Sequence, residues 1–127
     1  MNAPRPVLPF YFGLPDKPLF GCYHEPRFGN SRKCAVVVCQ PVGHEYIYSH
    51  RALRQLAVRL SDSGFPVLRF DYYGCGDSHG NAEDGEVCQW LEDIANAISE
   101  VRYRARVARV CLVGLRIGAS LAMMTAT

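Results

Sequence analysis

The stretch from Val110 to Ala122 limits most strongly what this chain can fold into. A short run of apolar and β-branched residues leads into Gly-x-Arg-x-Gly, and small residues at helical spacing follow. This order predicts a buried strand that turns sharply into a helix. Gly114 and Gly118 flank the turn, and we expect the strand and helix backbones to approach too closely there for a Cβ atom.

The same layout is that of a nucleophile elbow, in which a central serine stands exposed on a strained turn above a helix N-terminus. Arg116 occupies the central position in this chain. A guanidinium is always protonated and cannot attack a carbonyl carbon. The turn therefore predicts a catalytic architecture that lacks its nucleophile.

Length and composition predict one globular domain over residues 1–127, with residues 1–6 as a disordered lead-in. The hydrophobic content of 49% and the charged content of 20% are ordinary for a soluble protein. The net charge is +2 and the basic residues are spread along the chain, so we expect no nucleic-acid partner.

The cysteines and histidines argue against several other classes of protein. The N-terminus lacks the charged-then-apolar pattern of a secretory signal, so we expect reduced cysteines and a cytoplasmic protein. Cys34, Cys39 and Cys111 fall in runs expected to form buried strands. The chain has no Cys-x-x-Cys pair and its histidines are scattered, so no metal or other cofactor is predicted. Arg116 interrupts the longest apolar stretch near the C-terminus, which argues against a membrane span.

Hydrophobic periodicity predicts strands that alternate with helices. The expected elements are a hairpin over 7–13 and 19–24, strands over 34–40, 65–70 and 107–113, and helices over 49–63 and 87–101. Such alternation predicts an α/β fold with a mostly parallel sheet, an N-terminal antiparallel hairpin and helices on both faces. Ligands of such sheets bind beyond the carboxyl ends of the strands. Gly43, Gly74 and Gly114 follow three of these strands, so we expect one site at that edge.

Three motifs, in the same order, resemble the N-terminal half of an α/β-hydrolase. They are Gln40 to Glu45 in place of an oxyanion loop, Asp71 to Ser78 in place of Asp-x-x-Gly-x-Gly-x-Ser, and the elbow. Within that superfamily the chain looks like the serine-aminopeptidase-like and monoglyceride-lipase-like group. More narrowly, it resembles bacterial proteins, some of them grouped with exosortase-associated hydrolases, that carry Gly-Leu-Arg-Leu-Gly-Ala in place of the serine elbow.

The resemblance implies hydrolysis of a carboxylic ester, thioester or amide, with a small acyl or ester compound as the ligand. It places Arg116 at the nucleophile position and gives the backbone N–H groups of Val42 and Ile117 the role of oxyanion donors. Gly43 and His44 would lie against the ligand.

In these hydrolases the acid and the histidine follow the serine, after later strands, whereas no histidine follows Arg116 here. We therefore expect this chain to be the front portion of a longer fold and to be inactive by the Ser-His-Asp route. The elbow strand would keep an unpaired edge, from which we expect self-association.

Two further hypotheses about Arg116 stay open. In the first, the chain is a non-catalytic binding protein that uses Arg116 to hold an acidic or acyl ligand. In the second, Arg116 only pairs with a nearby acidic residue of the chain. Ser120 and Ser78 are candidate substitute nucleophiles, although Ser78 is better suited to capping its turn. His44 would either polarise a bound carbonyl or hydrogen-bond its loop.

The hypothesis that the chain binds a nucleotide rests on the glycines that follow the expected strand over 65–70. Gly74 and Gly76 begin a Gly-x-Gly-x-x-Gly pattern, but His79 stands where the third glycine belongs. A further polar stretch also separates these glycines from the next helix, whereas phosphate binding needs the helix to begin at the glycines. The pattern therefore favours a turn, which we expect Asp71 and Asp77 to fix.

Overall fold

The computed structural model describes residues 7–27, 32–75, 78 and 87–126. The expected lead-in at residues 1–6 lies outside this part of the chain. The elements, in chain order, are β1 (Val7–Leu14), β2 (Lys17–His24), β3 (Cys34–Cys39), α1 (His44–Asp62), β4 (Val67–Phe70), α2 (Val87–Ala105), β5 (Arg109–Gly114) and α3 (Ile117–Ala126).

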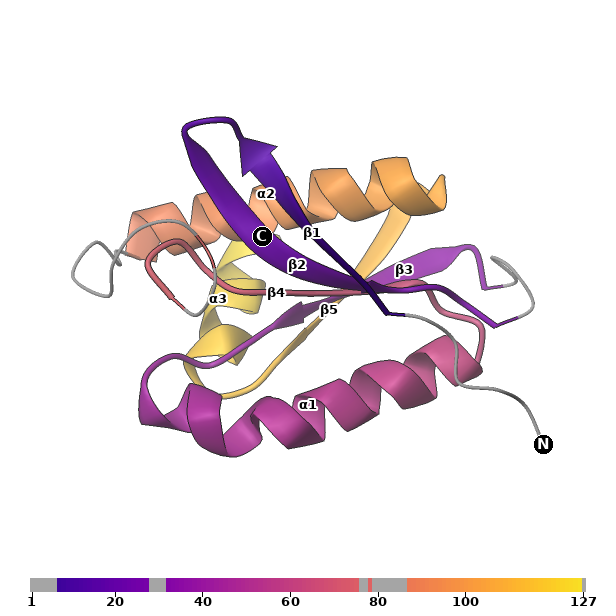
Figure 1. Ribbon diagram of the computed structural model, residues 1–127, viewed down its shortest axis with the longest axis horizontal. Coiled ribbons are helices and arrows are strands. Elements are labelled where there is room, and N and C mark those ends of the chain that lie inside the picture. Colours follow the sequence, from indigo (N-terminus) through magenta and orange to yellow (C-terminus); the bar gives the residue numbers. More distant parts are fainter. Residues whose placement is uncertain (1–6, 28–31, 76–77, 79–86, 127) are drawn as a thin grey trace.

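The strands form one mixed sheet in the order β1-β2-β4-β3-β5. The hairpin of β1 and β2 is antiparallel, and β2 also runs antiparallel to β4. β3 pairs in parallel with β4 on one side and with β5 on the other. Helix α1 covers one face of the sheet, while α2 and α3 cover the opposite face (Figure 1). The expected α/β architecture, with its N-terminal hairpin, is confirmed.

Strand β3 lies between two hydrophobic cores, which explains why its sequence is apolar without interruption. Val36 and Val38 pack with residues of α1 on one face. Val37 and Cys39 pack with residues of α2 and α3 on the other. Each fully buried valine contributes about 1.5 kcal/mol or more to stability, so the strand needs both helical layers.

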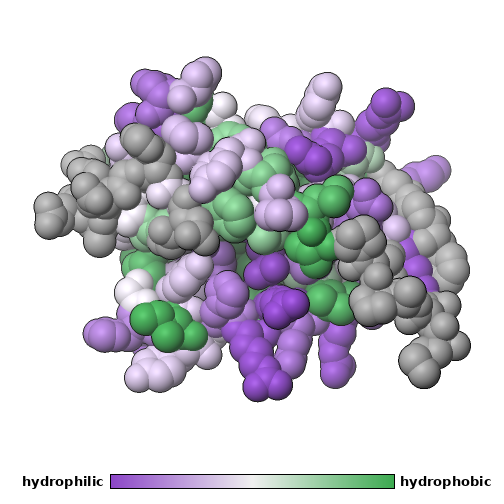
Figure 2. All heavy atoms as spheres, viewed as in Figure 1, coloured by the Kyte–Doolittle hydropathy of each residue, from purple (hydrophilic) through white to green (hydrophobic). Residues whose placement is uncertain are grey.

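Helix α1 begins at His44, earlier than the expected start at residue 49. The expected loop over 41–45 is therefore shorter than predicted, and His44 and Glu45 belong to the helix. The first turns carry no apolar stripe, because Ile47 and Tyr48 face solvent with 68% and 84% of their surface exposed. The hydrophobic period that marks the rest of the helix is absent there. In Figure 2 the outward side of α1 is covered largely by polar side chains.

The prediction that three cysteines lie in buried strands is wrong for Cys111. Cys39 is buried, Cys34 is half-buried and Cys111 is exposed. The reason is the strand order: β5 is an edge strand, so its side chains have neighbours on one side only. Burial raises the pKa of the Cys39 thiol to about 12, which makes it unreactive at neutral pH. No helix in the described part of the chain is long and apolar enough to span a bilayer.

The glycines of the elbow lie where the backbones meet, as expected. A Cβ atom on Gly118 would stand 2.1 Å from the carbonyl oxygen of Cys39, and one on Gly114 would stand 2.5 Å from the Cα of Ala119. These obstacles are backbone atoms, which cannot rotate away as a side chain can. The N-terminus of α3 therefore lies directly against the end of β3.

We predict that Gly118→Ala destabilises the fold far more than Ser120→Ala. The first substitution pushes α3 off β3 and should cost about 3 kcal/mol, the upper part of the range for overpacking. Ser120 lies exposed on the same helix, so alanine there should change the free energy of unfolding by less than about 0.5 kcal/mol. Urea unfolding of both variants measures the difference. Equal losses would show that α3 is free to shift.

Candidate functional site

The elbow is a strand-to-helix turn that holds Arg116 in an unusual backbone conformation. β5 ends at Gly114 and α3 begins at Ile117, so Leu115 and Arg116 form the whole connection. Arg116 has a φ of 60°, which lies in the left-handed region and costs a non-glycine residue roughly 1–2 kcal/mol. The sharp turn predicted from the sequence is present, and it exposes the side chain of its central residue.

Arg116 forms a two-point ion pair with Glu45 in the first turn of α1. Its Nε donates to Glu45 Oε2 at 3.1 Å and its Nη2 donates to Glu45 Oε1 at 3.0 Å. The hydrogen bonds and the charge of Glu45 raise the pKa of Arg116, so the guanidinium stays charged. The two side chains are 67% and 45% exposed, so water screens the pair and it contributes little to stability. The hypothesis that Arg116 pairs with a nearby acidic residue is thus met by Glu45.

A shallow hollow lies beside this ion pair. Its volume is about 360 Å³, and its lining residues are Glu45, Tyr48, Ser49, Leu115 and Arg116. Tyr48 and Leu115 are among the large hydrophobic side chains that face solvent. The elbow therefore combines an exposed cation with an apolar surface next to it.

The two expected oxyanion donors lie on the loops that follow β3 and β5. Ile117 is the first residue of α3, and the N–H groups after it bond within the turn, Gly118 to Leu115 O at 3.0 Å and Ala119 to Arg116 O at 3.0 Å. The backbone N–H groups of Val42 and Ile117 donate no hydrogen bond to any described residue. Both groups are available to an acceptor, and their catalytic role remains a prediction.

Gly43 and His44 lie at the start of α1 rather than within a loop. Gly43 takes the N-cap position with a φ of 67°, and the helix begins with the next residue. The placement of His44 in a loop was therefore wrong. Its side chain is exposed, and its imidazole has no hydrogen bond to the part of the chain that the structure describes. The expected loop hydrogen bond is thus not formed with any residue that the structure describes.

The turn after β4 is fixed by a network that centres on Asp71. Tyr46 of α1 donates its hydroxyl to Asp71 Oδ1 at 2.7 Å. Gln40, directly after β3, donates its Nε2 to Asp71 Oδ1 at 3.3 Å and to the carbonyl of Phe70 at 2.6 Å. Sequence analysis expected Asp71 to fix the turn but missed Gln40 and Tyr46, which join β3 and α1 to it.

Ser78 takes part in the same turn and is unsuited to nucleophilic attack. Its hydroxyl donates to the carbonyl of Asp71 and accepts the backbone N–H of Phe20 at 2.8 Å. The side chain is buried, so it serves as the cap that the sequence favoured. Ser120 lies in the first turns of α3, where it is exposed but is not the strained residue of the elbow. Gly76, Asp77 and His79 lie outside the described residues.

Asp93 of α2 is a second support of this turn that sequence analysis missed. Its Oδ2 accepts the backbone N–H of Tyr73 at 2.7 Å, and its Oδ1 accepts Nε2 of Gln89 at 2.9 Å. Asp93 is fully buried. The signal was available in the sequence, because this carboxylate interrupts the apolar stripe of α2 between Trp90 and Ala97.

Solved structures with the same arrangement are α/β serine hydrolases and esterases. A lidless serine hydrolase from Xanthomonas campestris superposes with a TM-score of 0.79 at 20% identity, over 98% of this chain and 58% of its own. A serine hydrolase homologue from Coxiella burnetii gives a TM-score of 0.77 at 20% identity, over 94% and 56%. The esterase Est1E from Butyrivibrio proteoclasticus, with ferulic acid bound, gives 0.73 at 22% identity, over 92% and 46%.

These likenesses show a partial α/β-hydrolase fold. This chain spans about half the length of the solved structures that it matches. No protein-family model and no curated protein matches its sequence. Within the described residues, no three His, Cys, Asp or Glu side chains lie close enough together to hold a metal ion. The narrower group suggested by the sequence stays a prediction.

We predict that Asp93→Asn flattens the pH dependence of stability between about pH 4 and neutrality. Burial raises the pKa of Asp93, although the bonds from Tyr73 and Gln89 oppose this rise. Because the carboxylate ionises less readily in the folded state, its contribution to stability is greatest below the unfolded pKa and falls as the pH rises through the folded one. Urea unfolding of both proteins across this range measures the effect. Parallel curves would contradict it.

Proposed function

We propose that this chain is a hydrolase-fold protein that does not hydrolyse esters by the serine route, and that its elbow binds an anionic acyl compound. The observation that carries the proposal is the position of Arg116, exposed on the strained turn and paired with Glu45. A permanently charged guanidinium at this position is not a nucleophile, but it is a bidentate hydrogen-bond donor to a carboxylate.

Several groups around the elbow support binding of a carboxylate. The guanidinium already holds one carboxylate side-on, which is the geometry that a ligand would need. The N–H of Ile117 at the start of α3 has no acceptor among the described residues, and a helix N-terminus favours a negative charge. The carboxylate of Glu45 occupies the guanidinium of Arg116 in the free protein, so a carboxylate ligand has to displace it. Because the exposed pair is weak, displacement costs little.

The apolar side of the hollow favours an acid with a hydrophobic body. Tyr48 and Leu115 lie beside Arg116 and would contact such a body while the carboxylate meets the guanidinium. Est1E, which shares this fold, is seen with ferulic acid, an aromatic carboxylic acid. Ferulate is therefore a suitable first probe of the class.

We predict no turnover of p-nitrophenyl acetate or butyrate by the purified chain. Arg116 cannot form an acyl-enzyme, and the available oxyanion donors do not replace a nucleophile. Arg116→Ser is also expected to be inactive, because no histidine follows this position to activate a serine. Release of p-nitrophenolate measures both. Turnover by the starting protein that is lost in Ser120→Ala would contradict the proposal and assign the chemistry to Ser120.

We predict that Glu45→Gln tightens ferulate binding by up to about fivefold, because it removes the carboxylate that competes for Arg116. Arg116→Ala should abolish the binding. Ferulate titration followed by NMR or calorimetry measures these changes. Glu100→Gln is the matched control, since it breaks an ion pair with Arg104 on α2, away from the elbow. Binding that survives unchanged in Arg116→Ala would overturn the assignment of the carboxylate to Arg116.

A further inference from the structure

Arg69 of β4 is a buried cation that the elbow does not use. The residue is 7% exposed, and its Nε donates to Nε2 of His24 at 2.9 Å. This acceptor is uncharged, because a ring nitrogen that accepts a hydrogen bond carries no proton. Within the described residues, the guanidinium of Arg69 forms no ion pair with a carboxylate. A charge buried in this way is costly unless a nearby group neutralises it.

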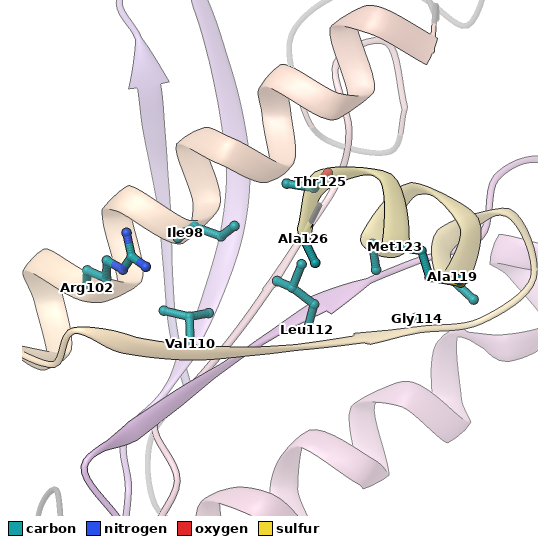
Figure 3. Close-up of a pocket in the computed structure, with 10 residues that line it drawn as sticks. Ile98, Arg102, Val110, Leu112, Gly114, Ala119, Met123, Thr125 and Ala126 are labelled. Carbon is teal, nitrogen blue, oxygen red and sulfur yellow. The ribbon is translucent and has the colours of Figure 1, made fainter.

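A small hollow of about 60 Å³ lies beside Arg69, between β2, β4 and α1. Cys22 of β2 and His50 of α1 also line it. The hollow is on the α1 side of the sheet, whereas the larger groove between β5, α2 and α3 is on the opposite side (Figure 3). Both strands that form the hollow are paired on each side, so no open strand edge contributes to it.

Cys22 is the direct cross-strand partner of Arg69. Both side chains lie on the α1 side, because Arg69 also pairs with Val38, which packs in the core beneath α1. Side chains that lie opposite each other on neighbouring strands have Cβ atoms about 4.5–5.5 Å apart. The sulfur of Cys22 is half-buried and lies against the same hollow. A cysteine and a buried guanidinium therefore share one small space.

The charges around Arg69 favour the thiolate form of Cys22. Burial lowers the pKa of Arg69, and the Cys22 sulfur opposes this fall more strongly than Asp71 does. Arg54 of α1 is a second cation close enough to lower the pKa of Arg69 further. Because such an influence is mutual, the same guanidinium stabilises a negative charge on the sulfur. The thiolate is the form of cysteine that reacts as a nucleophile.

The other polar groups of the hollow indicate what kind of molecule suits it. Asp71 carries an opposing negative charge, and its Oδ1 accepts hydrogen bonds from Tyr46 and Gln40. The Oε1 of Gln40 accepts none from the described residues, because its Nε2 makes the bonds to Asp71 and to the carbonyl of Phe70. His50 adds a further donor or acceptor. A molecule that both donates and accepts hydrogen bonds suits this lining better than a bare anion.

We propose that hydrogen peroxide selectively oxidises Cys22 in the hollow beside Arg69. Peroxide consists of two oxygen atoms that each donate and accept hydrogen bonds, and a hollow of this volume admits a molecule of that size. The thiolate attacks one oxygen, so an S–O bond forms as the O–O bond breaks. The second oxygen leaves as hydroxide beside the guanidinium and takes a proton from solvent. The sulfur is oxidised to sulfenic acid, and the peroxide is reduced to water.

The starting protein tests this proposal directly, because its cysteines differ in exposure. A substoichiometric amount of hydrogen peroxide is added at neutral pH, sulfenic acid is trapped with dimedone, and mass spectrometry locates the label. We expect Cys22 to be labelled before Cys88 and Cys111, although both of these are exposed. The matched control is Cys34, which is also half-buried but donates its S–H to the carbonyl of Ala35.

Labelling of an exposed cysteine ahead of Cys22 would overturn the proposal. Equal labelling of Cys22 and Cys34 would also overturn it, because half-burial alone would then explain the reactivity. Both comparisons are made within one protein, so neither depends on a variant that has to fold.

A variant without the charge tests its cause. Arg69→Met keeps a long unbranched side chain and should slow the oxidation of Cys22 by about three- to tenfold, because fewer of its thiols are ionised. Arg102→Met is the matched control, since Arg102 is exposed on α2, on the other side of the sheet, and it should leave the rate unchanged. Circular dichroism verifies the fold. An unchanged rate in folded Arg69→Met would refute the role of the guanidinium.

The pH profile of alkylation gives a readout that needs no peroxide. Iodoacetamide reacts with the thiolate, so its rate at each cysteine follows the ionised fraction. We expect the midpoint of the profile to lie at a lower pH for Cys22 than for Cys88, and to rise in Arg69→Met. A midpoint for Cys22 that equals or exceeds that of Cys88 would contradict the proposed thiolate.

Discussion

The contact between the N-terminus of α3 and the end of β3 is the constraint on which the candidate site depends. Gly118 leaves no room for a side chain against the carbonyl of Cys39. The chain reaches this position from β5 through two residues, and Arg116 adopts a left-handed backbone to complete the turn. The side chain of Arg116 therefore faces α1, where Glu45 meets it. A single close packing contact thus decides what the elbow exposes and what lies next to it.

Two strand ends at the carboxyl edge of the sheet are held by two different physical means. The end of β5 is fixed by glycine packing, and the end of β4 by hydrogen bonds from Gln40 and Tyr46 to Asp71. Asp93 supports the same turn after β4 by accepting the backbone N–H of Tyr73. Because these supports come from both helical layers, the edge is ordered before any ligand arrives. Preorganisation of this kind lowers the entropic cost of binding.

Sequence reasoning predicted the fold wherever one local signal dominated. The uninterrupted apolar run of β3 and the 3.6-residue stripe of α2 each indicated their element, and Gly114 and Gly118 indicated a close approach of backbones. The sequence was insufficient where the outcome depended on the assembled sheet. Cys111 looks like a core residue until β5 is known to lie at an edge. The start of α1 at His44 was missed because its first turns carry no apolar period.

The site was predictable only in part, for a related reason. Arg116 was found because its flanking glycines mark the turn. Its partner Glu45 was not, since the two residues are 71 positions apart and no spacing rule selects one acid over another. Asp93 had a local signal, a carboxylate on an apolar stripe, but its contact with Tyr73 depends on how α2 lies over β4. Long-range polar contacts of this kind follow from the fold and have no periodicity of their own.

The left-handed turn at Arg116 also makes the backbone conformation of the elbow independent of the functional group that the side chain carries. The backbone penalty is the same for nearly any side chain at this position, because it arises from the Cβ atom and the backbone rather than from the functional group. The packing of Gly114 and Gly118 makes no contact that depends on a guanidinium. The backbone of the elbow is therefore compatible with different side chains at position 116. An ancestral sequence could replace one functional group by another here and retain its scaffold, so a change of chemistry requires no change of architecture.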